Sequence, residues 1–155
     1  MIDKKSLKSP KKKINNRRKS RELIMKGVYR ALVNNFDINQ IKKDIQDDPD
    51  FIRADEVFLL EVMNGVFDNF DLLKKEIITY LDKNYDELSP IELAIIYSSL
   101  YELKFYPSVP YRVVINEAIE VAKSFGGTDG HKFINGVLNK AAALNRKHEF
   151  TSKAN

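Results

Sequence analysis

"SPIELAIIYSSLYELKF", residues 89–105, is the stretch that decides the fold of this chain. Ser89 offers a hydroxyl for an N-cap, Pro90 suits the first helical position, and Glu92 follows at the third, which is the residue order of a capping box. The helix that begins there is apolar around most of its circumference. Because such a helix must be covered on all sides, we predict that it forms the centre of a helical core.

Helical periodicity recurs on both sides of this segment, and no alternating strand pattern lies between turn signals. The other predicted helices cover residues 16–34, 38–45, 47–84 (as one or two helices), 109–127 and 131–144. Gly65 or Asp71 is the predicted break within the long third segment. The sequence therefore indicates an all-α protein.

Charge divides the chain into a basic end and an acidic remainder. The first 30 of the 155 residues hold twelve Lys and Arg against two acids, a net charge of +10. The rest of the chain holds 14 basic and 20 acidic residues, a net charge of −6. A basic end suits an anionic polymer and an acidic domain suits a basic protein, so we expect two classes of partner.

The length fits a single domain flanked by polar ends. We expect a disordered basic tail over residues 1–14, one helical domain over 15–145 and a disordered polar tail over 146–155, because both ends lack an apolar period. No apolar run approaches the roughly 18 residues of a spanning helix, and no signal-peptide core follows the basic stretch. We therefore expect a cytoplasmic protein without a membrane partner.

Composition and spacing argue against catalysis. The chain has no cysteine and only two histidines, which excludes disulfides, thiolate nucleophiles and cysteine-ligated zinc. Glu117 and Glu120 share a helical face, as a general acid and base would, but no histidine or metal ligand completes a site. "FGGTDGHKF", residues 125–133, lacks the Gly-Lys-Ser/Thr order of a phosphate-binding loop. We expect no enzymatic activity, no cofactor and no metal.

The basic run "RRKSREL", residues 17–23, is the first candidate binding site. Positive charge at a helix N-terminus is unfavourable because it faces the positive end of the macrodipole. This cost indicates that the basic residues are there to bind an anionic partner. Arg18 and Arg21 share an arc of the predicted helix with Tyr29. Single-stranded RNA needs this pairing, with cations for its phosphates and an aromatic ring for its bases.

Lys132 and Phe133 form a second pair of a cation and an aromatic ring, directly after the glycine-rich turn. Each of these features also has a purely structural explanation, without a role in binding. The basic run can be a solvated tail, and Tyr29 and Phe133 can be core residues. The glycine-rich stretch can be an ordinary turn between two helices.

Four segments, "RRKSREL" (17–23), "LYEL" (100–103), "VPYRVVINEAIEVAKSF" (109–125) and "HKFINGVLNKAA" (131–142), carry a resemblance to the bacterial transcription antitermination factor NusB family. The resemblance covers about residues 15–144 in the family's order and spacing. It implies an all-α fold of about seven helices in two packed small bundles, without enzymatic activity. It also implies binding of boxA in single-stranded RNA together with the small-subunit ribosomal protein NusE. That function supports ribosomal RNA operon transcription and RNA maturation within the RNA polymerase antitermination complex.

Matched by position, the resemblance implies two sets of contact residues. The implied RNA contacts are Arg17, Arg18, Arg21, Tyr29, Asp129, Lys132 and Phe133. The implied contacts with the ribosomal protein are Glu92, Tyr80 and Glu87. Two other functions remain open, namely a protein-only helical adaptor, including a homodimer, and the NusB-like appendage of ribosomal RNA methyltransferases. The appendage requires a cofactor-binding α/β domain that is absent from this sequence.

Overall fold

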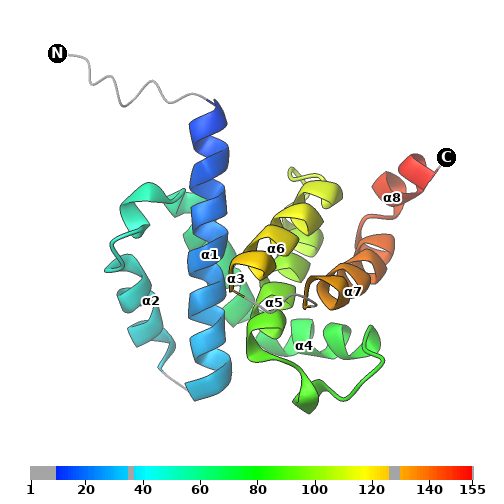
Figure 1. Cartoon of the computed structure of the whole chain (residues 1–155), viewed down its shortest axis with the longest axis horizontal. Helices are drawn as coiled ribbons and strands as arrows, with labels where there is room; N and C mark the ends of the chain where they lie inside the picture. Colours follow the sequence, from blue (N-terminus) through cyan, green and yellow to red (C-terminus); the bar gives the residue numbers. More distant parts are fainter. Residues whose placement is uncertain (1–9, 35–36, 126–129, 155) are drawn as a thin grey trace.

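The computed structural model describes residues 10–34, 37–125 and 130–154, with side chains from Asn16 to Thr151. Within these ranges the chain forms eight α-helices, two short 3-10 helices and no strand (Figure 1), which confirms the all-α prediction. The elements are α1 (Pro10–Asn34), α2 (Ile38–Gln46), η2 (Phe51–Arg53), α3 (Glu56–Asp68), α4 (Phe70–Thr79), η3 (Tyr85–Glu87), α5 (Pro90–Phe105), α6 (Tyr111–Phe125), α7 (Gly130–Asn145) and α8 (Lys147–Ala154).

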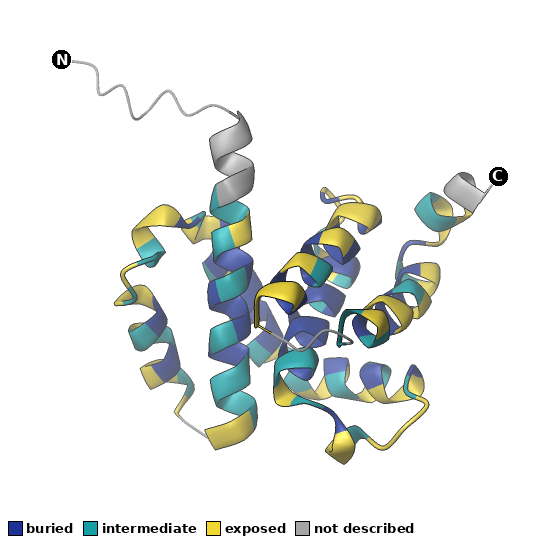
Figure 2. Cartoon of the chain, in the orientation of Figure 1, coloured by how far each residue is buried: buried dark blue, intermediate teal, exposed yellow. Residues whose placement is uncertain are grey.

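The central helix is α5, as its sequence predicts. Ser89 Oγ accepts a hydrogen bond from the Glu92 backbone N–H at 3.4 Å, and Pro90 is the first helical residue. Ten of the 16 residues of α5 are buried (Figure 2). It packs against α1 and α3 on one side and against α4, α6 and α7 on the other, so two groups of helices share one core.

One side of α1 packs against this core. Leu23, Ile24 and Val28 are completely buried on that side. At Gly27 the helix approaches its neighbours closely, because an added Cβ would lie 3.0 Å from Met63 Sδ and 3.5 Å from Ile41. The periodic apolar residues of the sequence therefore do face the interior, as predicted.

The N-terminal helix is longer than the sequence predicted. It begins at Pro10 instead of Asn16, so residues 10–14, which we expected to be disordered, are helical. Proline is favoured in a first helical turn, where its missing N–H has no partner in any case. The arginine run consequently lies about two turns inside the helix, where the macrodipole has little effect. Residues 1–9 of the predicted tail lie outside the described residues.

At the C-terminus, α8 replaces most of the predicted disordered tail. Glu149 accepts a hydrogen bond from the Tyr111 backbone N–H at 2.9 Å, an amide in the first turn of α6 that has no partner within its helix. The rings of Phe150 and Tyr111 also pack together, with centroids 5.2 Å apart. These contacts with a distant segment hold a helix that local sequence patterns do not predict.

The break between α3 and α4 falls at Asn69, between the two residues predicted for it. Gly65 lies inside α3 and is buried. A Cβ at this position would overlap the phenol ring of Tyr101 on α5. Gly65 therefore permits close packing of α3 against α5 and does not end the helix.

We expect Gly65→Ala to lower the free energy of unfolding by about 1–3 kcal/mol, because the added methyl group overpacks the contact with Tyr101. Gly136→Ala is the matched control in α7, at an exposed position where nothing lies within 4 Å of the added Cβ. This control should raise the free energy of unfolding by about 0.5–1 kcal/mol. Urea unfolding measures both values, and equal effects of the two substitutions would contradict the close approach at Gly65.

Candidate nucleic-acid and partner interface

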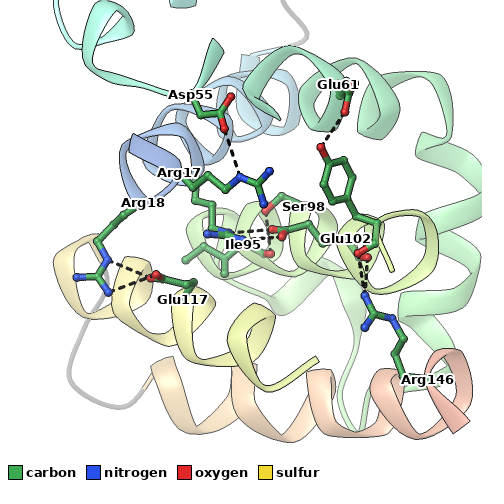
Figure 3. A network of polar contacts seen from close by, with 11 residues as sticks. Arg17, Arg18, Asp55, Glu61, Ile95, Ser98, Glu102, Glu117 and Arg146 are labelled. Carbon is green, nitrogen blue, oxygen red and sulfur yellow. Dashed lines mark hydrogen bonds and ion pairs between the residues drawn. The ribbon is translucent and has the colours of Figure 1, made fainter. Parts of the chain in front are cut away.

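The arginine run of α1 forms ion pairs with three other segments of the chain (Figure 3). The pairs are Arg17–Asp55 at 3.3 Å, Arg18–Glu117 at 3.0 Å and Arg21–Glu102 at 2.8 Å. The three acids belong to the N-cap of α3, to α6 and to α5. The three arginines therefore connect α1 to α3, α5 and α6, which no local pattern of the sequence revealed.

Arg21 is a core residue. It is only 8% exposed and Glu102 only 1%. The Nε and Nη2 atoms of Arg21 donate to the two carboxylate oxygens of Glu102 at 3.0 and 2.8 Å, a bidentate arrangement. The guanidinium also lies 4.9 Å from the ring centroid of Phe58. This placement does not support the predicted phosphate contact of Arg21, because its donors face the interior.

Arg17 and Arg18 keep part of their surface, with side chains 30% and 49% exposed. The hydrogen bond and the charge of Glu117 raise the pKa of Arg18. A pocket of about 450 Å³ opens beside Arg18, and residues of α6 line the rest of it. Arg18 can therefore bind an anion from solvent while its guanidinium remains paired with Glu117.

The other predicted RNA contacts lie at or near the surface. Tyr29 is half-buried on α1, Lys132 is exposed in the first turn of α7, and Phe133 beside it is half-buried. Both rings also pack against the core, which supports the core interpretation for the buried part of each ring, and the binding interpretation stays a prediction. Asp129 lies outside the described residues.

Sequence reasoning missed two lysines that lie over phenylalanine rings. The Lys26 ammonium lies 5.7 Å from the ring centroid of Phe125, and the Lys83 ammonium lies 4.5 Å from that of Phe133. The members of each pair are far apart in the sequence, so no spacing rule could have joined them. Both pairs involve ends of α6 and α7 that face each other across residues 126–129.

Two of the three predicted protein contacts remain accessible. Glu87 is exposed at the end of η3, and Glu92 is half-buried in the first turn of α5. An added Cβ on Gly130 would lie 3.3 Å from Glu92 Cδ, so this acid adjoins the start of α7. Since Lys132 and Phe133 lie two and three residues after Gly130, the predicted RNA and protein contacts lie near each other at the start of α7.

Tyr80 is buried, with 4% of its surface exposed, which does not support the predicted direct contact with a partner protein. Its hydroxyl donates a hydrogen bond to Glu76. Glu76 also accepts from Lys104 Nζ at 2.7 Å and from Asn145 Nδ2 at 2.8 Å. Burial acts to raise the pKa of Glu76, but these hydrogen bonds outweigh it and lower the pKa. Burial and the Glu76 carboxylate together raise the pKa of the Tyr80 hydroxyl.

The structure gives little support for a catalytic site. Glu117, half of the acid and base pair weighed above, is engaged by Arg18. Over the described ranges, no group of three or more possible ligand residues is arranged to hold a metal ion. None of the helices in those ranges has the length and apolar character to cross a membrane.

Comparison with known proteins decides the family. The model of the NusB family matches residues 18–143 of this chain. The chain belongs to the NusB family. It is 49% identical over 135 residues to the transcription antitermination protein NusB of Methylobacillus flagellatus, covering 87% of this chain and 88% of that protein. It is 45% identical over 133 residues to NusB of Neisseria meningitidis serogroup A, covering 86% and 94%.

Solved NusB structures share the fold. NusB of T. maritima superposes with a TM-score of 0.73 at 27% identity, covering 86% of this chain and 96% of that one. The NusB fold is also found, with a TM-score of 0.73 at 16% identity, in a crystal structure of the antitermination factors NusB and NusE in complex with dsRNA. That match covers 84% of this chain and 98% of the other. The family that the four sequence segments implied is therefore confirmed.

We expect Arg21→Ala to lower the free energy of unfolding by about 3–5 kcal/mol, because it leaves the carboxylate of Glu102 buried without a partner. The double variant Arg21→Met/Glu102→Leu should recover most of this loss, since it removes both charges. Arg18→Ala is the control and should cost less than Arg21→Ala, because the Arg18 side chain is 49% exposed and water can take its place beside Glu117. Denaturant unfolding of the three variants checks the order, and a small effect of Arg21→Ala would contradict the buried pair.

Proposed function

We propose that this protein binds boxA-type single-stranded RNA together with the ribosomal protein NusE. In that role it would act within the RNA polymerase antitermination complex and support transcription and maturation of ribosomal RNA. The observation that carries the proposal is the similarity to NusB antitermination proteins over nearly their whole length. The crystallised complex of a protein with the same fold, NusE and dsRNA supports these classes of partner.

The proposed RNA surface consists of Tyr29 on α1 and of Lys132 and Phe133 on α7. Exposed cations beside accessible rings support this choice, because phosphates and unstacked bases are recognised in that way. Arg18 is added because part of its side chain is exposed beside α6, and Arg17 and Asp129 are included on the resemblance alone. Arg21 is proposed to act indirectly, by holding α1 in place.

The proposed NusE surface contains Glu87 and Glu92. The net charge of −6 over residues 31–155 favours a basic ribosomal protein. Because Glu92 adjoins the start of α7, RNA and protein would share one continuous surface. Ligands that bind side by side on one surface can raise each other's affinity.

We expect weak binding of a short boxA-like single-stranded RNA to the protein alone and tighter binding when NusE is present. A scrambled RNA of equal length and the corresponding duplex are the controls, and both should bind less tightly. Fluorescence anisotropy at several salt concentrations measures these affinities. If NusE binds and RNA affinity stays unchanged, the shared surface is wrong. If NusE binds and the RNA does not bind with or without it, the protein is a protein-only adaptor and the proposed function is wrong.

We expect Tyr29→Ala to weaken RNA binding by about 1–3 kcal/mol and to leave its salt dependence unchanged, because base stacking releases no counterions. Arg18→Ala should instead flatten the slope of log K against log salt by about 0.7. Phe105→Ala is the aromatic control, since Phe105 is 45% exposed at the opposite end of α5 from Glu92. Equal losses for Tyr29→Ala and Phe105→Ala would remove Tyr29 from the RNA surface.

A further inference from the structure

Two lysine–phenylalanine pairs stand at the ends of α6 and α7 that are joined by residues 126–129. Phe125 is the last residue of α6 and is 37% exposed, and Lys26 reaches it from α1. Phe133 lies in the first turn of α7, and Lys83 reaches it from the segment between α4 and η3. Four separate parts of the chain thus build two similar pairs on neighbouring helix ends (Figure 1).

These lysines differ from the arginines of α1 in what surrounds them. Arg17, Arg18 and Arg21 are each paired with a carboxylate. Within the described part of the chain, no carboxylate lies within ion-pairing distance of the ammonium of Lys26 or of Lys83, and each ammonium lies over a ring. A cation over an exposed ring is held weakly, so a phosphate can attract it away.

Both lysines also extend the proposed RNA surface. Lys26 and Tyr29 are three residues apart on α1 and therefore share a face of the helix. Phe133, the ring partner of Lys83, directly follows Lys132 in the sequence. The two pairs thus connect the α1 part of the surface with the α7 part.

We propose that Lys26 and Lys83 are phosphate contacts of this RNA surface and that Phe125 and Phe133 are stacking platforms for its bases. In the free protein each ammonium covers the ring face on which a base would stack. When a base occupies the ring, the ammonium turns to the neighbouring phosphate, so one nucleotide uses both members of a pair. The proposal rests on the RNA-binding function proposed above and adds Lys26, Lys83 and Phe125 to its contacts.

The test uses the full-length protein with NusE and a short boxA-like single-stranded RNA, with affinity measured across salt concentrations. Lys26→Met and Lys83→Met keep the apolar stem and remove the charge, so each should flatten the slope of log K against log salt by about 0.7. Lys26→Arg and Lys83→Arg should restore the slope. Phe125→Leu should weaken binding about tenfold without changing the slope.

Lys43→Met is the matched control, because Lys43 is exposed on α2, a helix that lies apart from α6 and α7 (Figure 1). It should leave affinity and slope unchanged. If Lys26→Met and Lys83→Met bind with the wild-type slope, the lysines only support the rings and the inference is overturned, while the proposed function stands. If the wild-type protein itself does not bind the RNA, the proposed function fails.

Discussion

The buried ion pair between Arg21 and Glu102 is the constraint on which the arrangement of the helices depends. It lies where α1 packs on α5, the helix that touches both groups of the bundle. An unpaired charge at either position would cost several kcal/mol, so only a packing that brings the two side chains together is stable. The apolar side of α1 supplies most of the contact area, but apolar contacts alone tolerate many registers. The ion pair selects one of them.

Glu102 also connects the C-terminal end of the chain to this point. Its backbone carbonyl accepts a hydrogen bond from the guanidinium of Arg146 (Figure 3). The backbone carbonyls of Leu103 and Tyr106 accept hydrogen bonds from the same guanidinium. These carbonyls lie at the C-terminal end of α5, where backbone oxygens have no N–H donor within the helix. Arg146 is 8% exposed and links α7 to α8. One acidic residue in the central helix is thus contacted through its side chain by the first helix and through its backbone by the residue that joins α7 to α8.

This internal use of arginine changes where an anionic partner would bind. The arginines of the basic run are engaged by Asp55, Glu117 and Glu102, whereas Lys26 and Lys83 lie over phenylalanine rings at the ends of α6 and α7. Guanidinium groups suit fixed, bidentate pairing inside a protein, and ammonium groups on flexible stems suit exchange with a mobile ligand. This difference between the three arginines and the two lysines is the reason for placing the proposed phosphate contacts at the ends of α6 and α7.

The sequence by itself determined most of the helices, the central position of α5, the cap at Ser89 and the NusB family, because caps, periodicity and motifs consist of residues close together in the chain. Only the tertiary structure decided which basic residues are internal. Arg21 and Tyr29 lie on the same arc of α1. Arg21 is nevertheless buried, because it pairs with Glu102, which is 81 positions away in the sequence. Glu149 caps α6 across 38 positions, which turns an expected disordered tail into α8. The lysine–phenylalanine pairs are equally long-range. Local patterns fix which face of a helix is apolar, whereas the partner of a charge is fixed only when distant segments pack together.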